Sequence, residues 1–185
     1  MKVIQPILTV ADLDCLPEDG NRYELIEGEL FVSRAPSLIH QRVVYNLLIG
    51  IGTYLVHSPI GILVPGPGLI FSEFSGVIPD LVFVKKERFD DIASGERLTG
   101  APDLVIEVLS PGAANENRDR KVKRRLYAQY EVKEYWIVDP ENKSVEVYYL
   151  KEGNLELIAT YYQQDEITSA VLADFHLKIS EVFKL

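Results

Sequence analysis

Cysteine and histidine are scarce in this chain of 185 residues, which contains one cysteine and three histidines. Cys15 cannot form an internal disulfide, and no histidine lies near it in the sequence to activate a nucleophilic thiol. We therefore interpret Cys15 as a small buried hydrophobe or a surface bystander. A lone cysteine fits the reducing cytoplasm, which is where we expect the protein.

Long hydrophobic runs are also lacking. The most apolar region, residues 43–71, is interrupted by polar residues and three prolines, whereas a membrane-spanning helix needs ~20 consecutive apolar residues. Near the start, the apolar stretch after Lys2 is broken by Gln5 and Pro6, so we predict no secretory signal. No membrane association is expected.

Positive charge is scarce overall but concentrated in one segment. The formal net charge is −9, which argues against a protein that binds nucleic acid non-specifically over its whole surface. Residues 118–125 (RDRKVKRR) hold six basic residues and one acidic residue, against 13 basic and 27 acidic residues in the remainder. This segment is either the solvated face of a helix or a contact for an anionic target.

The distribution of apolar residues predicts α/β or α+β architecture. Helical spacing predicts a helix over 39–56, and alternation on both sides of Glu27-Gly28 predicts a β-hairpin over 23–33. Further predicted elements are a short helix or turn over 12–19, a helical turn within 85–100, hairpin strands after 134, and a last helix capped by Ser180. We expect one domain over residues 1–185, with a core of about 20–180 and a mixed central sheet flanked by helices.

Two predicted strands carry isolated carboxylates. Glu107 lies inside the apolar run 103–109, and Asp80 directly follows Pro79 in the run 78–84. An unpaired charge in a buried strand is costly, so Glu107 needs an ion pair, a raised pKa or a metal. Asp103 lies at the start of its strand, where it would hydrogen-bond the neighbouring loop.

If the two strands are neighbours, Asp80 and Glu107 can approach one cation. Carboxylate oxygens suit Mg²⁺ or Mn²⁺, and such an ion activates water and polarises a phosphate. Lys123, in the basic segment, would hold the nucleophilic water or offset charge in the transition state. A structural ion pair or an exposed sheet edge would also explain the carboxylates.

Six segments in a fixed order carry a further signal. They are 23–30 (YELIEGEL), His40-Gln41, 79–84 (PDLVFV), 101–111 (APDLVIEVLSP), 119–128 (DRKVKRRLYA) and 134–140 (EYWIVDP). Together they resemble the Uma-two family of restriction endonucleases, within the PD-(D/E)XK nuclease superfamily. The resemblance covers roughly residues 20–180.

The resemblance implies a restriction-endonuclease-like fold and Mg²⁺-dependent hydrolysis of phosphodiester bonds. Asp80 and Glu107 would be metal ligands, and the main-chain carbonyl of Val108 would complete them. The lysine that the superfamily places two residues after the glutamate is replaced by Leu109. Its match in this chain is Lys123, on the following helix, with Lys121 as the alternative.

Several other residues have a possible place at such a site. Glu24, on the first hairpin, either reaches the metal or is exposed to solvent. His40 begins a helix, where a purely local role is equally consistent, and Tyr127 shares the helical face of Lys123. Candidate phosphate contacts are Arg120, Lys121 and Arg124, together with Arg118 and Arg125.

The sequence therefore predicts a metal-dependent DNA endonuclease. A homodimer is expected, with the apolar helix over 43–55 and its two glycines at the interface. The alternative is a nuclease-fold nucleic-acid-binding or scaffold protein with weak or lost catalysis, which the acidic net charge and the missing strand lysine favour. A glycosidase with two acids is a third possibility, but a basic helix fits phosphate better than sugar.

Overall fold

The structure, a computed structural model, describes residues 7–184. Most of the segment considered as a secretory signal, residues 1–6, lies outside the described residues. The helices are α1 (Val10–Leu13), α2 (Leu38–His57), α3 (Lys86–Ile92), α4 (Ala113–Asn117), the π-helix η1 (Arg118–Lys123), α5 (Arg124–Gln129) and α6 (Ile179–Val182). Within residues 7–184, no helix has the length and apolar character needed to cross a membrane.

The central sheet contains six strands in the order β12-β11-β10-β9-β6-β3. Their bounds are β3 (Gly61–Pro65), β6 (Leu81–Lys85), β9 (Leu104–Val108), β10 (Glu134–Asp139), β11 (Ser144–Lys151) and β12 (Asn154–Tyr162). The pair β9–β10 is parallel and the other pairs are antiparallel, so the sheet is mixed as predicted. The helices α4, η1 and α5 form the crossover that a parallel pair requires.

A second six-stranded sheet, here called the N-terminal sheet, was not predicted. Its strand order is β2-β1-β5-β4-β8-β7, with β1 (Arg22–Ile26), β2 (Glu29–Ser33), β4 (Leu69–Ser72), β5 (Ser75–Val77), β7 (Ala93–Ser94) and β8 (Arg97–Leu98). The predicted hairpin is β1–β2, which pairs Arg22 with Ser33 at its open end. Because β7 and β8 have two residues each, their sequence is too short to show a strand pattern.

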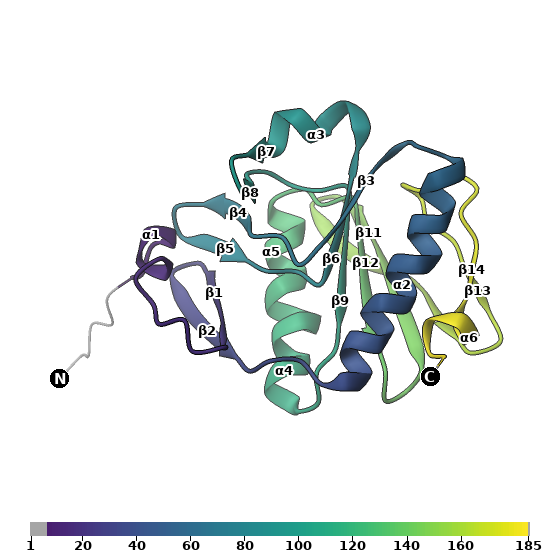
Figure 1. The fold of residues 1–185 in the computed structure, drawn as a ribbon, viewed down its shortest axis with the longest axis horizontal. Helices are drawn as coiled ribbons and strands as arrows, with labels where there is room; N and C mark the ends of the chain where they lie inside the picture. Colours follow the sequence, from purple (N-terminus) through teal and green to yellow (C-terminus); the bar gives the residue numbers. More distant parts are fainter. Residues whose placement is uncertain (1–6, 185) are drawn as a thin grey trace.

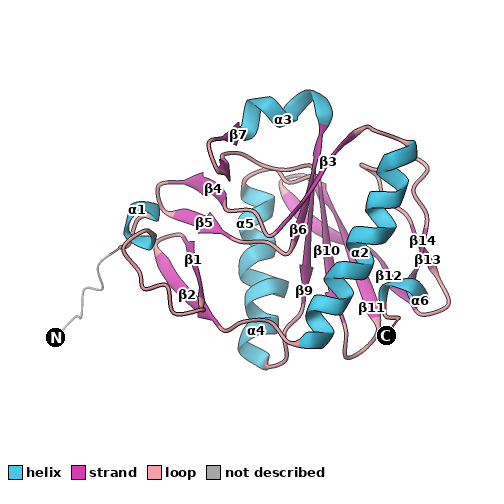
Figure 2. Ribbon diagram, viewed as in Figure 1, coloured by secondary structure: helices cyan, strands magenta, loops and turns pink. Residues whose placement is uncertain are grey.

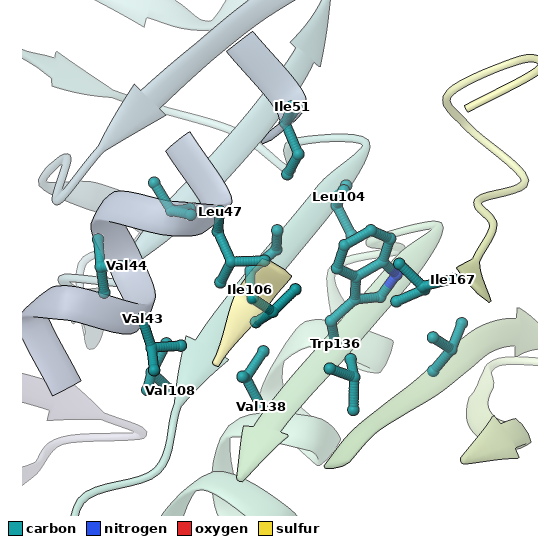
Figure 3. Close-up of a cluster of buried hydrophobic side chains, with 14 of the residues drawn as sticks. Val43, Val44, Leu47, Ile51, Leu104, Ile106, Val108, Trp136, Val138 and Ile167 are labelled. Carbon is teal, nitrogen blue, oxygen red and sulfur yellow. The ribbon is translucent and has the colours of Figure 1, made fainter. Parts of the chain in front are cut away.

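One face of the central sheet packs against α2. Residues Val43, Val44, Leu47 and Ile51 of this helix are buried, and they meet the alternate strand residues Ile106 and Trp136. Figure 3 shows these side chains pointing toward one another across the interface. The helical spacing of the apolar residues therefore marks the face of α2 that is buried in the core. These four residues are not available to the dimer interface expected over 43–55, and Gly50 faces Leu177.

The opposite face of the central sheet packs against α5 and the N-terminal sheet. Val105, Leu109 and Tyr135 contact Leu126 and Tyr127 in this second cluster. Figures 1 and 2 show α2 and α5 on opposite sides of the central strands, with the N-terminal sheet beside α5. The strands β9 and β10 are thus buried on both faces, which explains their continuous apolar sequence.

The C-terminal segment is fastened to the central sheet by Glu134. Its carboxylate accepts hydrogen bonds from Trp136 Nε1, Ser169 Oγ and the backbone N–H groups of Ala170 and Val171, at 2.6–3.1 Å. The segment continues through β13 (Glu166–Ile167) and β14 (Leu177–Lys178), which pair with each other. Burial raises the pKa of Glu134, whereas these hydrogen bonds lower it, and the net shift is upward.

Two predicted helix boundaries differ from the structure, and a third predicted helical element is present as expected. The early helix is α1, which starts before Asp12 because that carboxylate accepts from Thr9 N and Oγ1 at the helix start. The last helix, α6, starts at Ile179, and Lys178 rather than Ser180 is its N-cap. Ile179 is fully buried, so packing sets this start in preference to the serine hydroxyl. The predicted turn within 85–100 is α3.

Candidate active site

Asp80 and Glu107 lie on neighbouring strands of the central sheet. Strand β6 pairs with β9, with Leu81 opposite Ile106. Asp80 lies immediately before β6 rather than inside it, because Pro79 has no N–H to continue the ladder. In place of that ladder bond, Val108 N donates to Asp80 Oδ2 at 2.8 Å. The carboxylate is thereby fixed against the end of the Glu107 strand.

Glu107, Lys123 and Glu24 form a buried cluster of opposite charges. Lys123 Nζ lies 2.9 Å from Glu107 Oε1 and 2.8 Å from Glu24 Oε1, and only 2% of the lysine side chain is exposed. Tyr127 OH donates to the same Glu107 oxygen at 2.6 Å. Glu24 Oε1 also accepts from Ile78 N at 2.9 Å. The first hairpin, β9 and the basic helix therefore converge on one ammonium group.

The basic helix reaches this cluster through a π-helical turn. Within η1, Asp119 and Lys123 are buried, and Lys123 Nζ lies 4.0 Å from Asp119 Oδ1. Arg118 Nε donates to Asp119 Oδ1 at 2.9 Å, on the outer side of the pair. A π-helical turn costs stability and is frequent at functional sites. The predicted shared face of Asp119, Lys123 and Tyr127 is present, but the π-helix was not predicted.

The charges of the cluster shift one another's pKa values. Burial raises the pKa of Glu107 to about 8; the Lys123 ammonium opposes this, and the charges of Asp80, Asp119 and Glu24 add to it. Burial alone would lower the pKa of Lys123, but the carboxylates of Glu107, Glu24 and Asp119 outweigh it and hold the pKa above its ordinary value. The site thus has an excess of carboxylate over cation.

Asp80 has a different environment from Glu107. Its Oδ2 lies 3.1 Å from His40 Nε2, and Arg22 donates to its Oδ1 at 3.2 Å. Burial disfavours the ionised form, but the hydrogen bond and charge of His40 and the Val108 N–H lower the pKa of Asp80 overall. His40 Nδ1 is buried without a hydrogen-bond partner among the described residues. Asp80 is therefore the more readily ionised of the two strand carboxylates.

These side chains line one end of a polar cleft of about 380 Å³. The cleft lies between the first hairpin, the start of α2, the end of β9 and η1. Its walls carry four basic side chains, namely Arg22, Arg34, Arg118 and Lys123. An anionic ligand can therefore approach the carboxylates from a positively charged surface.

The predicted phosphate contacts lie elsewhere. Arg120 forms ion pairs with Glu146 and with Asp139 (3.1 Å), and Arg124 lies over the ring of Tyr148 at 5.3 Å. Lys121 is exposed, and none of these three residues lines the cleft. Positions 120, 121 and 124 are on other sides of the helix from Lys123. A count of basic residues does not show which side of the helix each of them occupies.

The cleft instead uses Arg22 and Arg34, which the sequence analysis missed. Arg22 lies one residue before the family-like segment 23–30, and Arg34 follows the second strand of the hairpin. Their positions at the open end of the hairpin were the available signal, since a hairpin brings its two ends together. Arg118 was named among the basic residues and does line the cleft.

The donor set fits a divalent cation at Asp80 and Glu107. Both protein hydrogen bonds to Glu107 go to Oε1, so among the described residues Oε2 is left for a cation. Arg22 is the single side-chain cation on Asp80 Oδ1, and it is partly exposed. Within residues 7–184, no group of three or more His, Cys, Asp or Glu side chains is arranged to hold a metal ion. Two carboxylates, a main-chain carbonyl and waters are nevertheless a common Mg²⁺ environment.

The other site predictions are also placed by the structure. Asp103 accepts from Lys85 N at 2.9 Å and from Arg88 at 2.7 Å, so it fastens the loop between β6 and α3 as expected of a strand-start residue. Leu109, at the position of the superfamily lysine, is buried against α5. Cys15 is exposed and unpaired. Arg125 pairs with Glu27 at the surface.

The mixed sheet and its buried carboxylate–lysine cluster define a nuclease fold of the restriction-endonuclease-like class. The family model described as "Uma2: Putative restriction endonuclease" matches residues 10–180, and the chain belongs to this family. The expectation from the sequence segments is thereby confirmed.

A solved structure supports the same fold. The chain is similar to a putative nuclease belonging to DUF820 from Anabaena variabilis ATCC 29413, with a TM-score of 0.76 and 19% sequence identity. The similarity covers 95% of this chain and 97% of the other. No curated protein matches the chain.

Proposed function

We propose that this protein is a metal-dependent endonuclease that hydrolyses phosphodiester bonds of DNA. The observation that carries the proposal is the buried cluster of Glu107, Lys123 and Glu24, next to Asp80, at the end of a basic cleft. Burying four ionisable groups is costly for stability alone. A site that binds an anionic substrate and a cation would explain why these four groups are buried together.

In the proposed reaction, water adds to phosphorus and one P–O bond to a sugar oxygen breaks. The attacking water loses a proton, and the leaving oxygen gains one. Lys123 is positioned by two carboxylates, so its ammonium can orient the attacking water and offset the negative charge that develops on the phosphate. Arg34 and Arg118 bind the phosphates on either side.

Mg²⁺ or Mn²⁺ would be held by Asp80, Glu107 and the main-chain carbonyl of Val108. Such an ion lowers the pKa of bound water and polarises the phosphate. Glu24 is already paired with Lys123 and Ile78 N, so its role would be to position the lysine or to reach the ion through water. Arg22 would leave Asp80 Oδ1 when the ion binds and would contact phosphate instead.

The test is cleavage of plasmid and single-stranded DNA in Mg²⁺, Mn²⁺ or EDTA. The variants are Asp80→Asn, Glu107→Gln and Lys123→Met, with Lys121→Ala as the matched control on the same helix. We expect cleavage that requires metal, that falls at least 100-fold in the three site variants, and that is unchanged in the control. Equal activity in every variant, or no cleavage of any nucleic acid in a broad panel, would contradict the proposal.

A second candidate is a nuclease-fold protein that binds nucleic acid with weak or lost catalysis. One observation favours it: the carboxylates already have protein cations, Arg22 on Asp80 and Lys123 on Glu107. Calorimetric titration separates the two candidates. Tight DNA binding without Mg²⁺ binding at Asp80 would support this second candidate.

We also propose a homodimer formed through α2. The outward side of this helix carries Leu38, Tyr45, Ile49 and Val56, all at least half exposed. The spacings 38–45 and 49–56 are heptads, so the four side chains form a stripe that a second copy of α2 can cover. Gly52 lies between Ile49 and Val56 in the sequence. A Cβ atom added to Gly52 would meet no other atom within 4 Å.

A cytoplasmic location is the last part of the proposal. The supporting observation is that Cys15 is both free and exposed, since an exposed thiol persists in a reducing compartment. Cell fractionation would test it, and recovery of the protein outside the cytoplasm would contradict it.

A further inference from the structure

A second cavity adjoins the polar cleft and has the opposite chemical character. Its volume is about 400 Å³, and its lining is mainly apolar, with Ile39, Leu109, Pro111 and Pro140 among the residues that form it. No lysine or arginine is part of its lining, whereas the carboxylates of Glu116, Asp139 and Glu141 are. The proposed nuclease reaction, as stated above, does not use this cavity.

The two cavities lie side by side and share one wall. Ser37, His40, Ser110 and Pro111 line both of them. His40 contacts Asp80 with Nε2, so the shared wall is in direct contact with the carboxylate that begins β6. When a ligand binds at the carboxylates, the neighbouring part of the same ligand is therefore close to the apolar cavity.

The two cavities differ in polarity in the same way as the two parts of a nucleotide, its charged phosphate and its flat base. The polar cleft carries Arg22, Arg34 and Arg118 and suits a phosphate. The apolar cavity suits a flat ring, and its carboxylates suit the amino groups on the edge of a base. A cavity of this volume accommodates a small ring system but not a DNA duplex.

Of the acidic residues in the second cavity, Glu141 is the one available to a ligand. Asp139 accepts from the backbone N–H groups of Glu141 and Asn142 and also pairs with Arg120. Glu116 lies 3.9 Å from the same arginine. The Glu141 side chain is exposed and makes no ion pair or hydrogen bond with another described residue.

We propose that this cavity, the base pocket, binds the nucleobase next to the scissile phosphate, and that Glu141 accepts a hydrogen bond from its exocyclic amino group. The inference rests on the proposed function and names its substrate class. A base in the pocket is outside the helical stack, so the substrate is a strand with an unpaired or extruded nucleotide at the cut. Cytosine, adenine and guanine carry an exocyclic amino group and thymine does not.

The experiment uses the full-length protein and fluorescent DNA hairpins that differ at a single unpaired nucleotide. That nucleotide is C, A, G, T or an abasic site, and a fully paired duplex completes the set. Cleavage rates are measured with Mg²⁺, and affinities by fluorescence anisotropy with Ca²⁺ in its place. We expect the abasic site to lower kcat/KM and affinity at least 10-fold, and T to be cut several-fold more slowly than C.

Two variants assign the effect to the pocket. Glu141→Met, which keeps the length of the side chain but removes the acceptor, should reduce the preference for C over T to less than twofold. Glu73→Met, in an exposed turn between β4 and β5, should keep the wild-type ratio. Ile39→Ser should weaken binding of hairpins that carry a base but not of the abasic hairpin. Leu157→Ser, an exposed apolar position on β12, is its control.

Two outcomes would overturn the base pocket while leaving the nuclease intact. One is cleavage of the abasic hairpin or the paired duplex at the rate of the base-containing hairpins. The other is an unchanged preference among bases in Glu141→Met. By contrast, a protein that neither cuts nor binds any of these DNAs, with or without a base, would overturn the proposed function and the pocket together.

Discussion

At the scale of single residues, two opposing effects act on the protonation state of Glu107. Burial and three neighbouring carboxylates favour its neutral form, whereas the Lys123 ammonium favours its ionised form. Burial is the largest cause of the upward shift of its pKa, and the ammonium offsets only part of it. A divalent ion would supply the missing charge and stabilise the ionised form.

This balance predicts a pH dependence of stability in EDTA. The pKa of Glu107 is raised from 4.5 to about 8, so its contribution to stability is complete below about pH 4.5 and is lost as pH rises through about 8. Wild type should therefore lose up to about 1.4 kcal/mol of stability per pH unit in this window relative to Glu107→Gln. Urea unfolding at pH 5–8.5 measures the difference.

The same titration has a control that involves metal. Added Mg²⁺ should stabilise wild type more at pH 8.5 than at pH 5.5, because only the ionised carboxylate binds the ion. Glu107→Gln should show no such difference. Parallel stability curves for the two proteins would contradict the shifted pKa.

A second prediction separates two sets of arginines. Arg34 lines the cleft, whereas Arg124 lies over Tyr148 on another side of the helix. Arg34→Gln should weaken binding of single-stranded DNA and reduce the slope of log K against log salt by roughly 0.7, the value for one phosphate contact. Arg124→Gln should leave the slope unchanged. Anisotropy titrations at 50–200 mM salt decide, and equal slopes in both variants would exclude Arg34 as a contact.

These residues also show what a sequence can reveal. Asp80 and Glu107 were recognisable because carboxylates are rare in buried strands and need an explanation. Arg34 was not, since an arginine in a loop has no periodicity, and its position depends on how the hairpin lies against η1. In the same way, the charge of residues 118–125 did not predict which basic side chains line the cleft. Arg120 is bound by Glu146 and Arg124 lies over the ring of Tyr148, and neither partner is near them in the sequence.

At the scale of elements, the π-helix η1 determines which side chains face the cleft. An additional residue per turn places Asp119 and Lys123 on one side while α5 keeps Leu126 and Tyr127 in the core. No sequence pattern indicated this turn, since helical periodicity cannot resolve one extra residue. The mixed central sheet and the helix α2, by contrast, were predicted from alternation and helical spacing.

Deletion of Lys121 tests this role of η1. Without one residue the segment should become α-helical, with Asp119 and Lys123 three residues apart instead of four, so that the buried contacts of the cluster are lost or shifted. We expect unchanged helix content by circular dichroism but at least a 10-fold loss of cleavage. Lys121→Ala, which removes the exposed side chain and keeps the residue count, should behave as wild type. Full activity after the deletion would show that the π-helix is dispensable.

At the scale of the whole molecule, the exposed stripe on α2 predicts the oligomeric state. Ile49→Asp places a charge at the centre of the stripe and should convert a dimer to a monomer in light scattering. Leu157→Asp, an equally exposed apolar position on β12, is the matched control and should remain dimeric. A wild-type monomer at high concentration would contradict the proposed interface.

The site also draws on distant parts of the chain, from Glu24 in the first hairpin to Lys123 in η1. Strand β9, which carries Glu107, lies between β6 and the later strand β10. During synthesis, the cluster therefore cannot assemble until the ribosome has released about three quarters of the protein. A nascent chain that ends before β10 would lack this cluster, so on the proposed function hydrolytic activity would begin only once that strand has been synthesised.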